Sequence, residues 1–372
     1  MIPTFSYVND IYFGLGTSQK VLEVVAESGC AKPLLVTDQG LSGSGLVERL
    51  ALDELPKFDG VRTNPTEAQV SDGLAIYRKE KCDGIVAVGG GSSIDLAKCL
   101  GILVNHSEPL EQYAILNAGQ ARIIEAVPPI VAVSTTAGSG SEVGKAALAT
   151  MGSGDKLGFL SPKLLPTAAV CDPDLTVSMP PGLTAGTGLD AISHCVETFC
   201  STRYNPVADA IALDGLARGC GAIERAVKDG TDREARQEMM LCSLQGGMAF
   251  PKSLGAVHSL SHPLGGFAEK QLHHGTLNGL FLPIVLRFNM EFCREKVARM
   301  AECLGLDCGD DLPSFFEGLN RKLGLPGSLG EMGVKAEDLE PLAEKAMMDH
   351  CSATNPRLLT ERDLRELYHA AL

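Results

Sequence analysis

One pattern occurs three times in the first half of this 372-residue chain and constrains its fold more than any other feature. A short apolar run is followed by a glycine- or serine-rich turn and then by a stretch that can form a helix. The three runs are residues 33–38, 84–88 and 130–134. Uninterrupted apolar runs of this kind, each followed by a helix, are typical of strands buried on both faces of a parallel sheet. The pattern therefore predicts an α/β nucleotide-binding domain, which we place at residues 1–177.

The second half of the chain lacks this pattern. A proline- and glycine-rich joint at residues 179–182 precedes long stretches in which apolar residues recur at spacings of three and four. Such spacings are typical of amphipathic helices, and we find no further clear strand. Thr360 is expected to cap the last helix. The sequence thus predicts an all-helical domain at residues 178–372.

Composition excludes several classes of function. The chain has 32 Lys and Arg against 46 Asp and Glu, a formal net charge of -14, so it would repel a nucleic acid or an anionic bilayer. The first residues, Met1 to Ser6, lack the basic stretch and apolar run of a signal peptide. No segment offers the about 18 uninterrupted apolar residues that a membrane span requires. We therefore expect a soluble cytoplasmic protein.

The 12 cysteines do not indicate a disulfide framework or a zinc module. They make up about 3% of the chain, which is below the density of disulfide scaffolds. No two of them form a C-x-x-C motif, the spacing that holds thiolate-bound metals. We expect most of them to be small buried hydrophobic residues.

The turn at residues 89–93, Gly-Gly-Gly-Ser-Ser, is a candidate phosphate-binding loop. It follows an apolar run and precedes a helix, so backbone N–H groups can approach a pyrophosphate without obstruction by Cβ atoms. Neither the G-x-G-x-x-G fingerprint nor the P-loop pattern is present, which leaves open a tight turn that binds nothing. A second glycine turn at residues 135–140 favours dinucleotide binding.

Asp38 ends the first apolar run. A carboxylate at this position can accept hydrogen bonds from the adenosine ribose and would repel a 2′-phosphate, which favours NAD over NADP. The alternative is that Asp38 only caps a helix or a turn.

Five of the eight histidines lie between residues 194 and 274, and they indicate a metal site. Asp190 and His194 are four residues apart, as are His258 and His262. This spacing places both members of each pair on one face of a helix, a common geometry for two ligands of one cation. One carboxylate and three imidazoles could hold a divalent cation and still leave room for substrate.

Not all of these histidines can be ligands if a coordination position stays open. At least one of His262, His273 and His274 is therefore a proton carrier, a supporting group or a bystander. Glu197, three residues after His194, could also face the site. We interpret it as a solvated or capping carboxylate.

Taken together, these motifs resemble those of the iron-dependent (group III) alcohol dehydrogenase family. The resemblance runs essentially from end to end and is carried by residues 89–95, 135–143, 188–194, 258–265 and 274–278. It implies the dehydroquinate synthase-like fold of that family, with an α/β NAD-binding domain followed by an all-helical domain. It also implies an NAD-dependent oxidoreductase of alcohols that uses Fe²⁺, with Zn²⁺ as the alternative metal, and that forms dimers or larger oligomers.

The resemblance carries over to individual residues. It implies metal ligands at Asp190, His194, His258 and His274, and a non-ligand histidine near the nicotinamide, His262, as the catalytic proton carrier. His274 is preferred to His273 because Gly275 follows it. The implied cofactor contacts are Asp38, Asn64, Gly90, Gly91, Ser92, Thr135, Thr136, Ser139 and Lys156.

Within the family, residues 248–258 and 272–279 are most similar to 4-hydroxybutyrate dehydrogenases, which interconvert 4-hydroxybutyrate and succinate semialdehyde. A substrate carboxylate needs a cationic partner. We nominate Lys252, six residues before His258, with Phe250 as a second substrate contact. The alternative for Lys252 is that it covers the end of a helix. Hydroxyalkyl sulfonates and plain short alcohols or diols remain alternative substrates.

Two other classes of function are alternatives. Dehydroquinate-synthase-like lyases use the same two-domain architecture and also hold NAD and a metal, but they return the hydride within one turnover. A non-catalytic NAD-binding or regulatory protein would need a decayed ligand set, whereas every ligand position is filled here. The long dehydrogenase-type motifs favour a dehydrogenase over both.

Overall fold

The computed structural model describes residues 7, 9–267, 270 and 272–372. Residues 1–6, on which the signal-peptide argument rests, lie outside the described residues. The chain divides into two compact units. Residues 9–136 and 141–176 form an α/β unit, and residues 137–140 and 177–372, with Tyr7, form a helical unit. The predicted fold class, an α/β domain with a parallel sheet followed by an all-helical domain, is confirmed.

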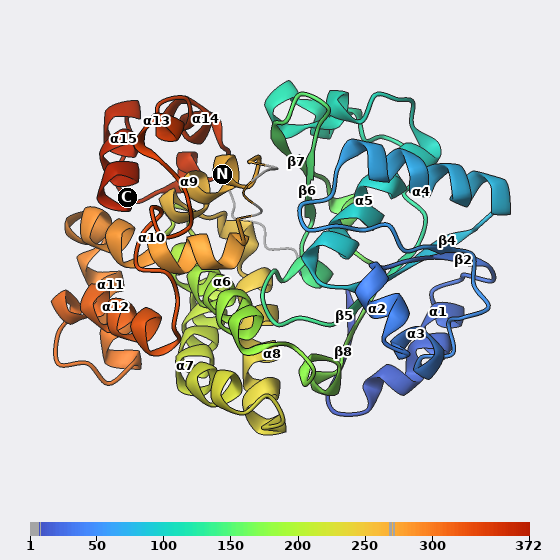
Figure 1. The fold of residues 1–372 in the computed structure, drawn as a ribbon, viewed down its shortest axis with the longest axis horizontal. Helices are drawn as coiled ribbons and strands as arrows, with labels where there is room; N and C mark the ends of the chain where they lie inside the picture. Colours follow the sequence, from blue (N-terminus) through green and yellow to red (C-terminus); the bar gives the residue numbers. More distant parts are fainter. Residues whose placement is uncertain (1–6, 8, 268–269, 271) are drawn as a thin grey trace. The chain divides into compact units, whose positions relative to one another are not determined.

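The α/β unit is built on a six-stranded sheet in which all pairs are parallel. The strand order is β1-β8-β5-β4-β2-β3, and Figure 1 shows the helices of this unit packed around it. The three runs recognised in the sequence form β2, β4 and β5. The strands are β1 (Asp10–Phe13), β2 (Pro33–Val36), β3 (Lys57–Phe58), β4 (Gly84–Gly89), β5 (Ile130–Ser134) and β8 (Ala168–Cys171). An antiparallel hairpin of β6 (Ala146–Thr150) and β7 (Lys156–Leu160), which the sequence pattern did not predict, completes the unit.

Both faces of this sheet are buried, which explains why its strands are apolar throughout. In β2, Leu34 and Val36 belong to one core, whereas Leu35 belongs to the other. The first core contains residues of α4 and α5, and the second contains residues of α1 and α3. The helices of this unit are α1 (Val21–Glu27), α2 (Gln39–Gly43), α3 (Leu46–Arg49), α4 (Glu67–Glu80) and α5 (Gly91–Asn105).

The strand order reverses at β2, which pairs with β3 on one side and with β4 on the other. In open parallel sheets, ligands bind in the crevice beyond the carboxyl ends of the strands at such a point. Asp38 follows β2 there, and the turn that begins at Gly90 follows β4. The topology therefore places both candidate cofactor elements at the edge where a dinucleotide is expected.

The helical unit contains no strand among its described residues. Thr360 caps its last helix, as predicted: its hydroxyl accepts from the N–H of Asp363, whose carboxylate accepts from the N–H of Thr360. Asn205 caps α7 through the N–H of Ala208. The helices are α6 (Pro181–Cys200), α7 (Pro206–Lys228), α8 (Arg233–Met248), α9 (Ala256–Leu264), α10 (His274–Asn289), α11 (Arg294–Cys303), α12 (Leu312–Lys322), α13 (Ala336–Leu339), α14 (Leu342–Met348) and α15 (Glu361–Ala370).

Residues 137–140 interrupt the α/β unit and belong to the helical unit. Two glycines allow this short segment to lie against the helices. A Cβ atom on Gly138 would lie 2.9 Å from Cβ of Thr187, and one on Gly140 would lie 2.7 Å from Cα of Gly247. Gly140 also has a φ of +61°, which side chains other than glycine rarely adopt. The segment thus packs directly against α6 and α8.

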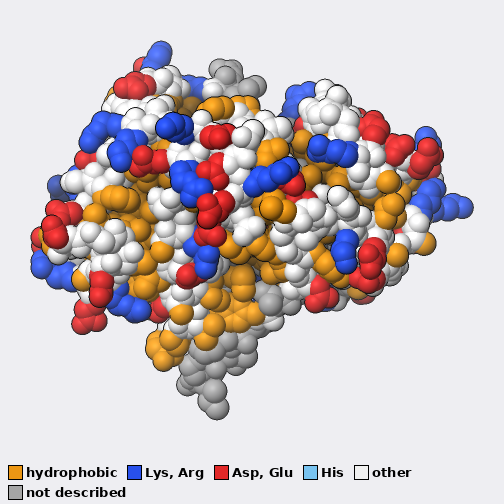
Figure 2. All heavy atoms as spheres, turned by 90° about the horizontal axis from the view of Figure 1, so that it is seen from below, with side chains coloured by type: hydrophobic (Ala, Val, Ile, Leu, Met, Phe, Trp, Pro, Cys, Tyr) orange, Lys and Arg blue, Asp and Glu red, His pale blue; other side chains and the backbone are white. Residues whose placement is uncertain are grey.

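Three further features concern the composition and the surface. All 12 cysteines are free and nine of them are buried, which confirms the expectation that most are small core residues. On the face shown in Figure 2, acidic and basic side chains are interspersed, so that face carries no single acidic patch. Within the described residues, no helix is both long enough and apolar enough to cross a bilayer.

Candidate metal centre and cofactor turns

Three helices bring the four predicted metal ligands together. Asp190 and His194 lie on α6, His258 on α9, and His274 begins α10. Oδ1 of Asp190 lies 3.6 Å from Nε2 of His194, 3.6 Å from Nε2 of His258 and 3.7 Å from Nε2 of His274. The first three side chains are buried, and that of His274 is 24% exposed, so the cluster is partly accessible at His274. Gly275 permits this arrangement, because a Cβ atom there would lie 2.1 Å from the carbonyl oxygen of Gly186.

The spacing of these donor atoms fits a divalent cation. A tetrahedral ion with metal–nitrogen bonds of about 2.0–2.1 Å separates its ligand atoms by about 3.3–3.4 Å. Burial alone would raise the pKa of Asp190, but the charges of His194 and His274 and the hydrogen bond with His258 hold it well below its ordinary value. The cluster therefore favours positive charge at its centre, and its imidazole and carboxylate donors suit Fe²⁺ or Zn²⁺.

Asn278, which the sequence analysis missed, faces the same cluster from α10. Its Nδ2 lies 2.7 Å from Oδ1 of Asp190 and 3.1 Å from Nε2 of both His258 and His274. An amide group has only two hydrogens to serve these three acceptors. Its own Oδ1 is buried and has no hydrogen-bond partner among the described residues. When the ring nitrogens carry no proton, lone pairs converge here in excess of the donors, as expected where a cation binds.

Glu197 is buried beside the candidate metal centre, so of its two interpretations the solvated carboxylate was wrong. The capping carboxylate is confirmed, because its Oε1 accepts from the N–H of Val257 at the start of α9. Its Oε2 lies 2.5 Å from Nδ1 of His258. Burial lowers the pKa of His258, but the hydrogen bonds and charges of Asp190 and Glu197 outweigh it and raise the pKa to about 9. Burial likewise lowers the pKa of His194, to about 4, against the opposing effect of Asp190. The spacing from His194 placed Glu197 on the correct helix face, but nothing in the sequence linked it to His258.

His262 lies beside the cluster rather than in it. Its Nδ1 lies 2.8 Å from Oδ2 of Asp349, and its ring stacks on that of His274 with 5.3 Å between centroids. Burial would raise the pKa of Asp349, but the charge and hydrogen bond of His262 hold it well below its ordinary value. The ring of His350 also stacks on that of His262, with 6.2 Å between centroids. Asp349 and His350 were not among the residues recognised in the sequence, because they lie about ninety positions further along the chain.

His273 has a different role from His274. It is the N-cap residue of α10, and its Nδ1 accepts a hydrogen bond from the N–H of Thr276. Burial lowers its pKa. The structure thus places the imidazole of His274, not the capping imidazole of His273, within 3.7 Å of Asp190.

Of the two predicted substrate contacts, Phe250 lies at the cluster, whereas the ammonium group of Lys252 is buried against Phe199 and Asp209. The ring of Phe250 meets that of His194 edge to face, with 4.9 Å between centroids. Lys252 is fully buried; its ammonium donates to the carbonyl oxygen of Phe199, 3.1 Å away, and forms an ion pair with Asp209. Because Phe199 lies in the last turn of α6, Lys252 covers a helix end, which was the alternative interpretation.

Replacing Lys252 with methionine is expected to destabilise the protein by about 2 kcal/mol or more, because it leaves the Asp209 carboxylate without its buried partner. Urea unfolding would measure this loss, with Lys228→Met, at an exposed position on α7, as the control. The ratio of kcat/KM for an anionic aldehyde to that for a neutral aldehyde should stay unchanged. A selective loss on the anionic aldehyde would restore Lys252 as an anion contact.

The candidate cofactor residues of the α/β unit lie mainly in turns that follow β2, β4 and β5. Gly90 is the N-cap residue of α5, and a Cβ atom on it would lie 2.9 Å from Oγ1 of Thr136. The first glycine turn therefore packs closely against the residues that follow β5. Asp38 caps α2 through the N–H of Leu41, so its capping role is realised at the position where it could also meet a ribose. Gly91 and Ser92 open α5, and Thr135 follows β5.

Asn64 and Lys156 meet although 92 positions separate them: Nζ of Lys156 donates to Oδ1 of Asn64 over 2.8 Å. Asn64 has a φ of +56°, a left-handed conformation that asparagine tolerates better than most residues. Ser139, the remaining predicted cofactor contact, lies in residues 137–140 of the helical unit. The structure thus brings Asn64 and Lys156 together and places Ser139 with the other unit.

A buried lysine holds the residues that follow the second glycine turn. Lys98 of α5 donates to the carbonyl oxygens of Ser141, Gly144 and Ala146 and to Oγ of Ser141, over 2.7–2.9 Å. Asp95 accepts from the same hydroxyl over 2.6 Å. Burial lowers the pKa of Lys98 to about 8, although Asp95 opposes this shift. The helix that carries the first glycine turn thereby fixes the path of the chain after the second.

The sequence matches two family profiles. Residues 9–173 match the family described as iron-containing alcohol dehydrogenase, and residues 184–372 match the C-terminal part of the Fe-containing alcohol dehydrogenase family. A 4-hydroxybutyrate dehydrogenase of Cupriavidus necator is 46% identical over 378 residues, which cover 98% of this chain and 99% of that protein.

Solved structures are similar over the whole chain. A crystal structure of a 1,3-propanediol oxidoreductase has a TM-score of 0.94 and 37% identity, with 100% of both chains covered. A sulfoacetaldehyde reductase from Bifidobacterium kashiwanohense in complex with NAD+ has a TM-score of 0.88 and 28% identity, with 100% of this chain and 99% of that chain covered. The chain is thus similar in both sequence and fold to dehydrogenases and reductases of alcohols and aldehydes.

Proposed function

Because the chain belongs to the iron-containing alcohol dehydrogenase family and is an oxidoreductase that acts on alcohols, we propose that it interconverts 4-hydroxybutyrate and succinate semialdehyde with NAD as hydride carrier. The single observation that carries the chemistry is the cluster of Asp190 with three imidazoles, all with Nε2 within 3.7 Å of its Oδ1. The similarity to a 4-hydroxybutyrate dehydrogenase over nearly the whole chain supports the choice of substrate.

In this proposal, Asp190, His194, His258 and His274 hold a divalent cation, Fe²⁺ or alternatively Zn²⁺. When bound, the cation supplies Lewis-acid polarisation of the substrate oxygen. Oxidation of the alcohol moves a hydride to NAD⁺ and releases one proton. His262 carries this proton at Nε2, while Asp349 holds the ring through Nδ1.

The α/β unit would hold the cofactor at the carboxyl ends of its strands. Backbone N–H groups at Gly90 and Gly91, where α5 begins, would meet the pyrophosphate. The carboxylate of Asp38 favours a ribose hydroxyl over a 2′-phosphate, which supports NAD rather than NADP. The NAD+ in the similar sulfoacetaldehyde reductase structure supports the same choice.

A neutral diol is the second candidate substrate, and two observations favour it. Lys252, the residue nominated to meet a carboxylate, is buried in an ion pair with Asp209. The similar structure with a TM-score of 0.94 is that of a 1,3-propanediol oxidoreductase. The anionic substrate therefore rests on overall similarity rather than on an identified anion contact.

The test is NADH oxidation by protein loaded with Fe²⁺ without oxygen, using succinate semialdehyde, sulfoacetaldehyde and 3-hydroxypropanal. We expect kcat/KM for succinate semialdehyde to exceed both others by at least about tenfold, a difference of about 1.4 kcal/mol in transition-state binding. Equal or greater activity with 3-hydroxypropanal would show that the enzyme interconverts this aldehyde and the corresponding diol instead. Formation of product without net NADH oxidation would indicate a lyase instead.

A further inference from the structure

We propose that Glu197 is a positioning residue that links the N-terminus of α9 to the metal centre. One oxygen of its carboxylate caps the helix, and the other fixes the imidazole of His258 so that Nε2 faces the cation. The inference rests on the proposed metal site. In this inference, Glu197 on α6 orients a metal ligand, His258, that lies on a different helix, α9.

Glu197 is well placed for this work. It lies seven residues after Asp190 and three after His194 on α6, so the three side chains share one face of the helix. Its Oε2 meets Nδ1 of His258 at 2.5 Å, and its Oε1 accepts from the N–H of Val257 at 2.7 Å. The side chains of Glu197 and His258 are 5% and 1% exposed, so bulk solvent does not reach either contact.

The N-terminus of α9 depends on side chains from elsewhere in the chain. Its N-cap residue is Gly255, which has no side chain to cap the helix. Asn355 accepts from the N–H of Ala256 at 3.1 Å, and Glu197 accepts from that of Val257. A Cβ atom on residue 255 would lie 2.9 Å from Oε1 of Glu197 and 3.0 Å from Oδ1 of Asn355, so only glycine leaves room for both caps.

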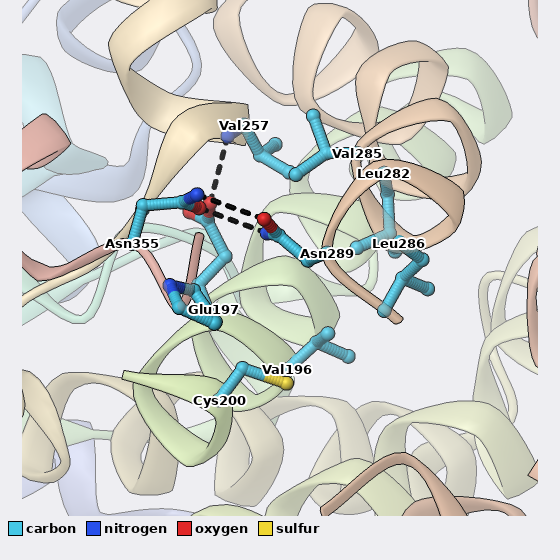
Figure 3. Close-up of a pocket in the computed structure, with 11 residues that line it drawn as sticks. Val196, Glu197, Cys200, Val257, Leu282, Val285, Leu286, Asn289 and Asn355 are labelled. Atoms are coloured by element: carbon cyan, nitrogen blue, oxygen red, sulfur yellow. Dashed lines mark hydrogen bonds between the residues drawn. The ribbon is translucent and has the colours of Figure 1, made fainter. Parts of the chain in front are cut away.

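Figure 3 shows this capping group around a small cavity of about 10 Å³, with room for about one water molecule. The side chains of Glu197, Asn289 and Asn355 converge there, and the two asparagines exchange hydrogen bonds of 2.8 Å in both directions. Apolar side chains such as Val285 and Leu286 line the rest. The carboxylate is therefore held in a packed, largely apolar environment.

The chemistry requires a carboxylate at this position. A carboxylate only accepts hydrogen bonds, so a neutral His258 must carry its proton on Nδ1 and keep the lone pair on Nε2. That Nε2 lies 3.6 Å from Oδ1 of Asp190, where the cation is expected. An amide of the same shape cannot accept at both ends. Glutamine at position 197 would therefore lose either the hydrogen bond from the N–H of Val257 or the hydrogen bond from Nδ1–H of His258.

Asn355 provides a matched control, because it caps the same helix at the adjacent N–H group, whereas its side chain has no hydrogen bond to His258 among the described residues. The experiment uses full-length protein freed of metal by chelation and titrated with Zn²⁺ against a chromophoric chelator. The variants are Glu197→Gln, Glu197→Asp, Asn355→Ala and His258→Ala. The melting temperature of each metal-free variant reports on its folding.

We expect Glu197→Gln to raise the Kd for Zn²⁺ by about 10–100-fold, the usual cost of losing a group that orients a ligand. Asn355→Ala should leave the Kd within about threefold of wild type even if it lowers the melting temperature more. Glu197→Asp keeps a group that only accepts and should fall between Glu197→Gln and wild type. This order would not arise if Glu197 only stabilised the helix.

Two results would overturn the inference alone, provided that His258→Ala no longer binds Zn²⁺. The first is a Kd of Glu197→Gln for Zn²⁺ within threefold of wild type. The second is a Kd of Asn355→Ala that rises as much as that of Glu197→Gln. If Glu197→Gln fails to fold, an affinity of Glu197→Asp no better than that of His258→Ala overturns the inference too. If His258→Ala binds Zn²⁺ as wild type does, the ligand assignment fails, and the inference with it. The two failures are therefore distinguishable.

Discussion

Replacing His194 or His258 with alanine is expected to abolish metal retention and dehydrogenase activity together. Each residue supplies one of only four donor atoms, and each is almost fully buried, so no surface side chain can replace it. Loss of a bound Lewis acid removes several kcal/mol of transition-state stabilisation, which corresponds to a decrease in kcat of at least about 10³-fold. Elemental analysis after gel filtration would measure the metal, and NADH formation from 4-hydroxybutyrate would measure the activity.

The control for these variants is His369→Ala, which removes an exposed imidazole from α15 and should change neither quantity. The affinity for NADH offers a second control, because the turns at Gly90 and Thr135 belong to the α/β unit. A His194→Ala or His258→Ala protein that kept both its metal and its activity would show that the ligand assignment is wrong.

Replacing His262 with glutamine is expected to lower kcat by about 10²–10⁴-fold, the usual contribution of a general acid or base, while the bound metal stays near normal. The reason is position: His262 stacks on His274 but is held by Asp349 at Nδ1, outside the ring of donors around Asp190. Rapid kinetics under saturating NAD and substrate, with metal analysis of the same sample, would measure both quantities.

His350→Ala is the matched control, because that ring also stacks on His262 but has no role in the proposed reaction. It should lower kcat far less than His262→Gln does. Loss of metal in His262→Gln would show that His262 is a ligand and that one of the four assigned residues is the proton carrier.

The strands that could be predicted were those with long apolar runs. Residues 33–38, 84–88 and 130–134 became β2, β4 and β5 because a strand buried on both faces cannot alternate polar residues. β3 has only two residues. β8 has the sequence Ala-Ala-Val-Cys, and a run of four small residues does not distinguish a strand from part of a helix. Their identity is set by pairing with neighbouring strands, which is a tertiary property.

The site shows the same division between local and tertiary information. Helical spacing was sufficient to pair Asp190 with His194, because both lie on one helix. Glu197 and Asn278 meet His258 only after three helices pack together, so no spacing rule could have found these contacts. Lys252 illustrates the opposite error: its position in the sequence says nothing about the direction of its side chain, which the end of α6 and Asp209 determine.

Because residues 137–140 belong to the helical unit, the two units cannot be exchanged between relatives by a single crossover. The chain leaves the α/β unit after residue 136, returns at residue 141 and leaves again after residue 176, so no single cut releases either unit whole. A polypeptide that began at residue 177 would lack the tetrapeptide that covers Thr187 and Gly247. Exchange of the α/β half between relatives must therefore preserve the packing of this tetrapeptide against the helices of the recipient protein. During synthesis the ribosome releases the tetrapeptide before those helices, so they can fold onto a segment that is already present.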